Sequence, residues 1–348
     1  MEKKTERSSG SKPSVAIVIL NWNGRYFLEK FLPSVYNSTY PELRFIIGDN
    51  GSTDDSLAFV RENYPNIELV CNDRNYGFAG GYNRVLEGVD ADYLVLLNSD
   101  VEVTPGWIEP VIAWMEANSD IAATQPKILS FHERHKFEHA GAAGGYIDAF
   151  GFPFCRGRLL SETEEDQGQY NDYCDVFWAT GAAFFIRKSC WDQAGGFDAD
   201  FFAHMEEIDL CWRLKHLGYR ISYCPDSVVY HVGGGTLSKS NPWKTKLNFR
   251  NNLMMLQKNL PFWEAVWVIP IRLWLDFFAL LHFAFKRNFK DALAVHQAHK
   301  AFFSAFFHTA RKRQAPHPLK DKAGYYSGSI AWAFYLRGKR KFSDLFLS

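Results

Sequence analysis

The sequence predicts an α/β protein built on an open, mostly parallel sheet with helices on both faces. Three observations support this fold class. Short β-branched apolar runs alternate with amphipathic segments over about the first hundred residues. The first run, at residues 15–20, is apolar at every position, as in a strand buried on both faces of a parallel sheet. Polar clusters follow the runs, at the edge where such sheets bind ligands.

The first hundred or so residues supply strands and helices in alternation. Strands are expected at residues 15–20, 43–48, 67–71 and 93–97. Residues 27–37 form a helix with apolar side chains along one side, and a second helix begins at Asp55, capped by Ser52 or Asp54. A glycine-rich loop at residues 77–81 precedes a third helix.

The pattern is looser in the rest of the chain. Residues 121–173 are typical of glycine-rich and charged loops, residues 176–187 of a strand, and residues 205–216 of a helix closed by Gly218. Aromatic-rich helices with interleaved basic residues follow. We therefore expect a flexible N-terminus, an α/β domain and a helical C-terminal region, at residues 1–13, 14–241 and 242–348.

The composition excludes some classes of protein. The 348 residues are 47% hydrophobic and 22% charged, which is typical of a globular chain. The net charge of zero argues against a nucleic-acid partner, because such proteins carry a basic excess. The six cysteines form no CxxC pair, which indicates free thiols in a reducing compartment. The apolar run at residues 15–20 is too short for a signal-peptide core, so we expect a cytoplasmic protein.

Two polar clusters follow predicted strands. Asn98, Ser99 and Asp100 end the fourth strand, where the carboxylate can hold a hard divalent cation. An ordinary strand-to-turn exit uses the same residue types. Asp49 opens the cluster after the second strand and can accept a hydrogen bond from a base or ribose, while Gly51 lets a ligand approach the backbone. A capped helix start explains that second cluster equally well.

Two further candidates lie later in the chain. Glu206, Glu207 and Asp209 fall in the first turn of a predicted helix, where the helix dipole favours acidic residues. Asp209 stands one turn before Arg213 and is expected to pair with it, which leaves Glu206 or Glu207 free to act as a general base in a cleft. His231 follows an apolar run and precedes three glycines, and it can be a metal ligand or a structural histidine.

The order of these clusters is typical of one family. The chain contains, in sequence, VAIVILNWN, GDNGSTD, NYGFAGGYN, LLNSDVE, WATGAAFFIRK, GGFDADFFAHMEEIDLCWR and VVYHVGGG. In this order the runs resemble the inverting family 2 glycosyltransferases of the GT-A fold, and among them the rhamnosyltransferase-like branch. The resemblance covers residues 14–236.

The resemblance implies roles at the predicted ligand edge. Asp49 matches the aspartate that contacts the nucleotide base. Asp100 closes the D-x-D-type motif, whose first position is Asn98 here, and is expected to bind the Mg²⁺ or Mn²⁺ that bridges the donor's two phosphates. His231 matches a histidine that completes the metal site in some members. Further substrate contacts are expected within the matching runs, from Asn21, Asn75 and Gly80.

The resemblance also implies the catalytic groups and the reaction. Glu207 falls where the family places its base, usually an aspartate, so Glu206 stays an alternative. Trp178 and Gly181 match the segment that shapes the acceptor and sugar pocket. The implied reaction is a metal-dependent, inverting displacement, in which a sugar moves from a nucleoside-diphosphate sugar to a hydroxyl of a glycan or lipid-linked acceptor in cell-surface polysaccharide synthesis. A sugar nucleotidyltransferase and a catalytically silent membrane- or partner-binding scaffold are the alternatives.

The C-terminal region predicts contact with a membrane surface. Residues 261–286 are rich in tryptophan and phenylalanine but include Arg272 and Asp276, which are costly in a spanning helix. Aromatic residues that alternate with basic ones fit a helix in the plane of the interface, on the inner face of the cell membrane. Packing on the catalytic domain, or on a second subunit of a homodimer, is the alternative.

Overall fold

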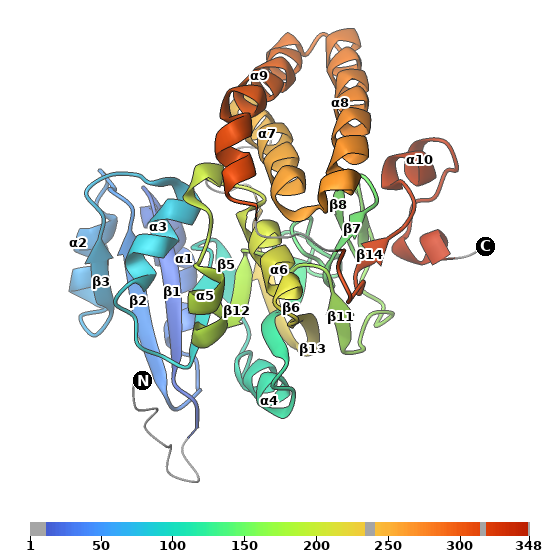
Figure 1. Cartoon of the computed structure of the whole chain (residues 1–348). Coiled ribbons are helices and arrows are strands. Elements are labelled where there is room, and N and C mark those ends of the chain that lie inside the picture. Colours follow the sequence, from blue (N-terminus) through green and yellow to red (C-terminus); the bar gives the residue numbers. More distant parts are fainter. Residues whose placement is uncertain (1–11, 234–240, 314–317, 347–348) are drawn as a thin grey trace.

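A computed structural model describes residues 12–233, 241–313 and 318–346 (Figure 1). Its main sheet contains β1 (Val15–Asn21), β2 (Leu43–Asp49), β3 (Glu68–Cys71), β4 (Tyr93–Leu97), β5 (Val101–Val103), β6 (Ile121–Ser130), β11 (Cys174–Val176), β12 (Ala183–Arg187) and β13 (Arg220–His231). The order is β11-β13-β6-β12-β4-β1-β2-β3, and β5 pairs with β13. The strands β1 to β4 are parallel, whereas β12 is antiparallel to β4. The predicted fold class is confirmed.

Alternate side chains of β1 enter two separate cores, one on each face of the sheet. Val15, Ile17 and Ile19 pack with α1 (Arg25–Tyr36), α2 (Ser56–Asn63) and α4 (Glu109–Ala117). Ala16 and Val18 belong to the core on the opposite face, with α3 (Gly77–Leu86), α5 (Lys188–Ala194) and α6 (Glu206–His216). Because both faces are covered, β1 needs apolar residues at successive positions, as its sequence shows.

The glycine-rich run at residues 77–81 is helical, so the prediction of a loop there is wrong. These residues form the first turns of α3. A Cβ on Gly81 would lie 2.8 Å from Leu20 and 2.9 Å from the amide of Asn50. The glycine therefore lets α3 pack directly against the ends of β1 and β2, a packing requirement that sequence pattern alone does not reveal.

The prediction of loops at residues 121–173 is also wrong for much of its length. Residues Ile121–Ser130 form β6, in the middle of the main sheet. Its buried polar residues Gln125 and Lys127 interrupt the apolar pattern that would identify a strand. The later part forms a second sheet, in the order β10-β9-β8-β7-β14. Its strands are too short for alternation to be visible in the sequence: β7 (Gly145–Asp148), β8 (Pro153–Cys155), β9 (Arg158–Leu159), β10 (Glu162–Thr163) and β14 (Tyr325–Tyr326).

The C-terminal region is helical, as predicted. It comprises α7 (Pro242–Asn259), α8 (Phe262–Phe285), α9 (Phe289–Arg311), α10 (Ile330–Tyr335) and the 3₁₀ turn η2 (Phe342–Phe346). Figure 1 shows α7, α8 and α9 rising together above the sheet. Leu253 and Leu256 of α7 are buried in the same core as α3 and α6, and β14 joins the second sheet. The region therefore shares its core with the α/β part of the chain.

Candidate active site

The first part of the site lies where β1 and β2 end. Asn21 and Asp49 are direct partners across the two parallel strands. The Asn21 side-chain amide donates to Asp49 Oδ1 at 3.1 Å and to the hydroxyl of Ser56 at 2.9 Å, while Asp49 Oδ2 accepts from the N–H of Ser52 at 2.9 Å. Asn21 Oδ1 is buried without a partner among the described residues. Both predicted substrate residues are thus fixed at the ligand edge, with an acceptor oxygen left over.

Asn50 joins this edge to the start of α3. Its side-chain amide donates to Asn75 Oδ1 at 3.0 Å and to the carbonyl of Gly77 at 2.9 Å. Asn75 in turn accepts from the N–H of Gly77 at 2.8 Å. Gly80 lies one turn further along α3, and a Cβ at this position would lie 3.2 Å from the Cβ of Tyr76. The predicted residues Asn75 and Gly80 therefore stand at the positive end of a helix, which favours an anionic ligand.

Asp100 and His231 meet, as the resemblance predicts for the metal ligands. Both are buried, and Asp100 Oδ1 lies 3.2 Å from His231 Nε2. The other ring nitrogen, Nδ1, lies 3.2 Å from Glu138 Oε2. Burial would lower the pKa of His231, but the two carboxylates outweigh it and raise the pKa to about 10. Gly233 has φ +73° and comes so close to Glu138 that a Cβ would lie 2.5 Å from Oε1.

The donor set fits a divalent cation once His231 releases the proton that the two carboxylates otherwise stabilise. An octahedral ion with ligands at about 2.1 Å holds neighbouring ligands about 3.0 Å apart, close to the separation of Asp100 Oδ1 from His231 Nε2. Glu138 stands where a carboxylate typically fixes the tautomer of a metal-binding histidine. No group of three or more His, Cys, Asp or Glu side chains suited to a metal occurs among the described residues. One or two protein ligands are usual where substrate phosphates supply the rest.

The predicted bases lie at the start of α6, after a loop with unusual backbone. Phe202, His204 and Met205 all have positive φ, between 64° and 73°. The carbonyl of Phe202 accepts from the N–H of Ala79 at 3.1 Å, which attaches this loop to the start of α3. Left-handed backbone at three non-glycine residues is costly and persists only where surrounding contacts enforce it.

Three unpartnered polar atoms gather in this segment. Among the described residues, His204 Nε2, Glu206 Oε2 and Glu207 Oε2 are buried without a hydrogen-bond partner. Burial, together with Glu207, raises the pKa of Glu206 well above its usual range. Burial also raises the pKa of Glu207, to about 7. Buried polar atoms are normally satisfied, so these three are candidates for contact with a bound substrate.

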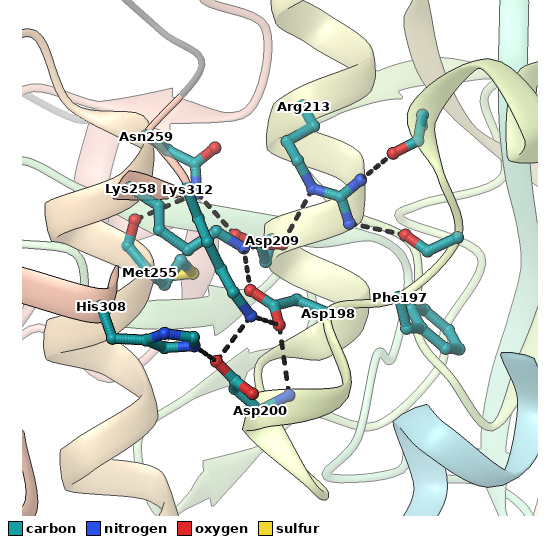
Figure 2. Close-up of polar contacts among 12 residues, drawn as sticks. Phe197, Asp198, Asp200, Asp209, Arg213, Met255, Lys258, Asn259, His308 and Lys312 are labelled. Atoms are coloured by element: carbon teal, nitrogen blue, oxygen red, sulfur yellow. Dashed lines mark hydrogen bonds and ion pairs between the residues drawn. The ribbon is translucent and has the colours of Figure 1, made fainter. Parts of the chain in front are cut away.

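Asp209 is excluded as a catalytic base by its partners (Figure 2). Its side chain has no exposed surface. One carboxylate oxygen accepts from Arg213 Nε and from Lys258 Nζ, each at 2.9 Å, and the other accepts from the Asn259 amide at 2.8 Å. The predicted pair with Arg213 is confirmed, but two of the partners come from α7 and were not foreseen. Asp209 thus serves to attach α6 to the C-terminal helices.

A second set of contacts from α7 holds the loop that precedes α6. The Asn251 side-chain amide lies 2.9, 2.8 and 2.7 Å from the carbonyls of Phe201, Ala203 and His204. Arg250 donates to the carbonyls of Asp200 and Phe201 at 2.9 and 3.0 Å. These contacts supply the external constraint that the left-handed backbone of the loop requires.

The remaining predicted residues lie between these groups or behind them. The N–H of Asn98 donates to the carbonyl of Ala182 at 3.0 Å, which places Asn98 beside the segment that carries Gly181. A Cβ on Gly181 would lie 3.3 Å from the ring of Phe78 on α3. Trp178 is only 5% exposed, and its indole N–H donates to the carbonyl of Tyr146 at 2.8 Å. Its polar atom is therefore taken by the second sheet, and the contact of Trp178 with a sugar stays a prediction.

Sequence reasoning missed Glu138 and the residues of α7. Glu138 lies in a connection that gives no periodic signal, 38 residues after Asp100. Asn251 and Lys258 are ordinary polar residues for a helix, and nothing local distinguishes them from solvent-facing ones.

Comparison with known proteins gives a family match. The family model described as glycosyl transferase family 2 matches residues 14–192. Those residues include the edge formed by β1, β2 and β4 and the start of α3, and the match stops before α6.

Curated relatives cover more of the chain. An N-acetylglucosaminyl-diphospho-decaprenol L-rhamnosyltransferase of Mycobacterium tuberculosis is 26% identical over 230 residues, which is 62% of this chain and 75% of the relative. The rhamnosyltransferase WbbL of Escherichia coli is 24% identical over 253 residues, or 68% of this chain and 91% of the relative. Both matches cover more of the chain than the family model does.

Solved structures share the fold. GalNAc-T7, crystallised with UDP, GalNAc and Mn²⁺, superposes with a TM-score of 0.55 at 15% identity, over 72% of this chain and 48% of its own. The mannosyltransferase PcManGT of Pyrobaculum calidifontis, in complex with GDP-Man and Mn²⁺, gives a TM-score of 0.54 at 14% identity, over 84% and 88%. At these identities the likeness concerns the fold alone.

Proposed function

Since the chain belongs to glycosyltransferase family 2, we propose that it transfers a sugar from a nucleoside-diphosphate donor to an acceptor hydroxyl, with inversion at the anomeric carbon. One observation carries this proposal. The carboxyl group of Glu207, whose Oε2 has no partner among the described residues and whose pKa is raised to about 7, follows a loop that is bonded to the start of α3, next to the Asn21–Asp49 edge. A carboxylate whose pKa lies near neutral pH is suited to remove a proton from a hydroxyl.

The donor would lie across the ends of β1, β2 and β4. Asp49 and Asn21 would receive the base and ribose, and the phosphates would lie at the start of α3. Asp100 and His231 would hold Mg²⁺ or Mn²⁺, which neutralises the charge of the leaving diphosphate when bound. The two superposed transferases that were crystallised with a nucleotide and Mn²⁺ support this choice.

The acceptor hydroxyl would approach from the side of α6. Glu207 would accept its proton as the new glycosidic bond forms, and the bond from the anomeric carbon to the diphosphate oxygen would break in the same displacement. Burial and the neighbouring Glu207 raise the pKa of Glu206 well above its usual range, which favours its protonated form. Glu207 is the residue at the position where the family resemblance implies the base, and a single displacement inverts the anomeric centre.

The relatives support a deoxyhexosyl donor and a lipid-linked acceptor. Two of them are named rhamnosyltransferases, and the name of one includes a diphospho-decaprenol acceptor. A reaction of this type belongs to the synthesis of cell-surface polysaccharide, as the sequence resemblance implies.

A lipid-linked acceptor requires access to a membrane, and α8 supplies a suitable surface. This helix is the one stretch of the described chain that is long and apolar enough to cross a membrane. Its outer face exposes Trp263, Trp267 and Trp274, at 75%, 72% and 65%. Two of its charged residues, Arg272 and Asp276, are buried on the other side and bond to each other at 2.8 Å, whereas Glu264 is exposed in the first turn of the helix. A helix with one face on protein and one apolar face fits the plane of the interface, and we propose the inner face of the cell membrane.

Release of nucleoside diphosphate tests the proposal. The full chain would be incubated with UDP-, GDP- and dTDP-sugars, with Mn²⁺, Mg²⁺ or excess EDTA, and with a lipid extract as acceptor. We expect one base to give metal-dependent release that rises with acceptor, and the product to have the inverted anomeric configuration. Release that EDTA does not reduce would contradict the metal, and a retained configuration would contradict the single displacement.

A further inference from the structure

We propose that a basic groove between α7 and α9 binds the diphosphate of a polyprenyl-diphosphate-linked acceptor, an inference that rests on the proposed function and names its acceptor site. The groove consists of two adjoining cavities, of about 480 Å³ and 290 Å³, which share Ala301 and Ala305 in their walls. Its polar lining comes from Lys246, Arg250, Gln297, Lys300, Ser304 and His308, with Asp200 at the inner end.

Two lysines of the groove differ from their neighbours in having no carboxylate partner. Among the described residues, Lys246 and Lys300 form no ion pair, whereas Arg250 and His308 lie beside Asp200 at the inner end. By contrast, the nearby Lys258 and Lys312 are each paired with two aspartates. Positive charge that is gathered in a concave site without a counter-charge favours a polyanionic ligand, and a diphosphate esterified at both ends, with one negative charge on each phosphate, matches Lys246 and Lys300.

The carboxylate at the inner end of the groove is already neutralised. Asp200 Oδ2 lies 2.7 Å from His308 Nε2 and 2.5 Å from Lys312 Nζ (Figure 2). Asp200 therefore adds little repulsion to an anion bound further out, toward Lys246 and Lys300.

The groove also leads toward the proposed base. Arg250, in its wall, donates to the carbonyls of Asp200 and Phe201, in the loop that runs into Glu206 and Glu207. A diphosphate held in the groove would thus keep the sugar attached to it close to the acceptor side of the active site.

The outer rim of the groove suits a polyprenyl chain. Lys300, Ser304 and His308 are spaced four residues apart and form one stripe along α9. Phe303 and Phe307 precede Ser304 and His308 by one residue and form a neighbouring stripe, 56% and 79% exposed. A ligand with a diphosphate head and an apolar tail matches this pairing of stripes, whereas a soluble glycan or a free phosphate matches only the basic one.

Binding of farnesyl diphosphate, a short polyprenyl diphosphate, tests the site without the donor reaction. Binding to the full chain would be measured by isothermal titration in EDTA, which leaves no divalent cation for Asp100 and His231. We expect Lys246→Gln/Lys300→Gln to weaken binding by about tenfold or more, since two charge-assisted contacts are lost. The matched control, Lys286→Gln/Lys290→Gln, removes the same charge from the α8–α9 connection and the start of α9 and should leave the affinity unchanged. Farnesol, which has no phosphate, should bind far more weakly than farnesyl diphosphate.

Two results would overturn the assignment. Equal affinity of the groove variant and the wild type for farnesyl diphosphate would show that the groove does not hold the diphosphate. Loss of flotation with vesicles of anionic phospholipid in the groove variant, with the control unaffected, would show that the groove binds lipid headgroups instead. The binding assay contains no nucleotide sugar, so its result does not depend on the transferase reaction. A chain that binds farnesyl diphosphate here but releases no nucleoside diphosphate in the donor assay would refute the transferase reaction without refuting the groove.

Discussion

Replacing Glu207 by glutamine separates the proposed base from its neighbour. The substitution keeps the size of the side chain but removes its ability to accept a proton. Loss of a general base typically lowers kcat by about 10² to 10⁴-fold. We expect Glu207→Gln to fall in that range while its affinity for the nucleoside diphosphate and Mn²⁺ stays within about threefold of wild type, since Glu207 lies on α6 and not among the nucleotide contacts.

The pH dependence follows from the environment of the carboxylate. Burial raises the pKa of Glu207 to about 7, and only the ionised form can act as a base. Activity should therefore fall as the pH decreases through 7, and kcat/KM of the wild type should be about tenfold lower at pH 6 than at pH 8. A glutamate with the usual pKa of about 4.3 would be ionised over this whole range and would give a flat profile.

The matched control is Glu206→Gln, one residue away. Burial and the neighbouring Glu207 raise the pKa of Glu206 well above its usual range, which favours its neutral form, so the amide should change its charge less than the same substitution at an exposed glutamate would. We expect a loss of kcat of less than about tenfold, with the acid limb of the wild-type profile retained. Steady-state rates from pH 5.5 to 8.5 for the three proteins provide the comparison. An inactive Glu206→Gln beside an active Glu207→Gln, or a flat wild-type profile, would refute the assignment of Glu207.

Three further variants test the metal site, the contact between helices and the membrane surface. Asp100→Ala should abolish turnover and Mn²⁺-dependent binding of nucleoside diphosphate without unfolding the chain, as measured by thermal shift; activity that survives excess chelator in the wild type would contradict this. Lys258→Met should lower the free energy of unfolding in urea by about 3 kcal/mol, because Lys258 is 4% exposed and lies between Asp198 and Asp209, and the more exposed Lys312→Met should cost less. Burial would raise the pKa of Asp198, but the two lysines outweigh it and hold the pKa at about 2. The stabilisation that the ionised Asp198 provides is therefore complete above pH 3.8 and is lost as the pH falls to 2. The difference in the free energy of unfolding between wild type and Lys258→Met should shrink over that window. Trp263→Glu/Trp267→Glu should reduce flotation of the chain with anionic vesicles, whereas Tyr26→Glu, which changes an exposed aromatic residue on α1, should not. Equal flotation of both variants would argue for another partner of α8, such as a second subunit. The molar mass of the protein in solution would reveal such a subunit.

The sequence was informative where a local pattern carries the structure. The strands at the ligand edge consist of consecutive β-branched or apolar residues, because both of their faces are covered, and each was predicted to within about two residues. The meeting of Asp100 with His231 was also predicted, although 131 positions separate them in the chain, because a family pattern records which distant residues share a site.

The sequence was uninformative where contacts are long-range and the residues are ordinary. Glu138 is one of many charged residues in its segment, and only the fold brings it to His231. Arg272 and Asp276 were interpreted as costly in a helix that spans a membrane, and they lie one turn apart and bond to each other in a buried position. Pairing at a spacing of four residues was visible in the sequence, whereas the face of α8 that would be buried was not.

The contacts of α7 and α9 change what the C-terminal region can be. A chain cut before Pro242 would lose Asn251, Lys258 and Lys312, and with them the constraints on the loop that ends at Glu206. Such a truncation would abolish activity whether or not the region contacts a membrane, so it cannot distinguish the two roles. Point variants on the outer face of α8 can distinguish the two roles, because that face is exposed and the contacts with the loop come from α7 and α9. If α8 lies on the membrane, the contacts of α7 and α9 with the loop before α6 also fix the height of Glu207 above the membrane surface. An acceptor hydroxyl then reaches the base only when its own lipid carrier holds that hydroxyl at the same height.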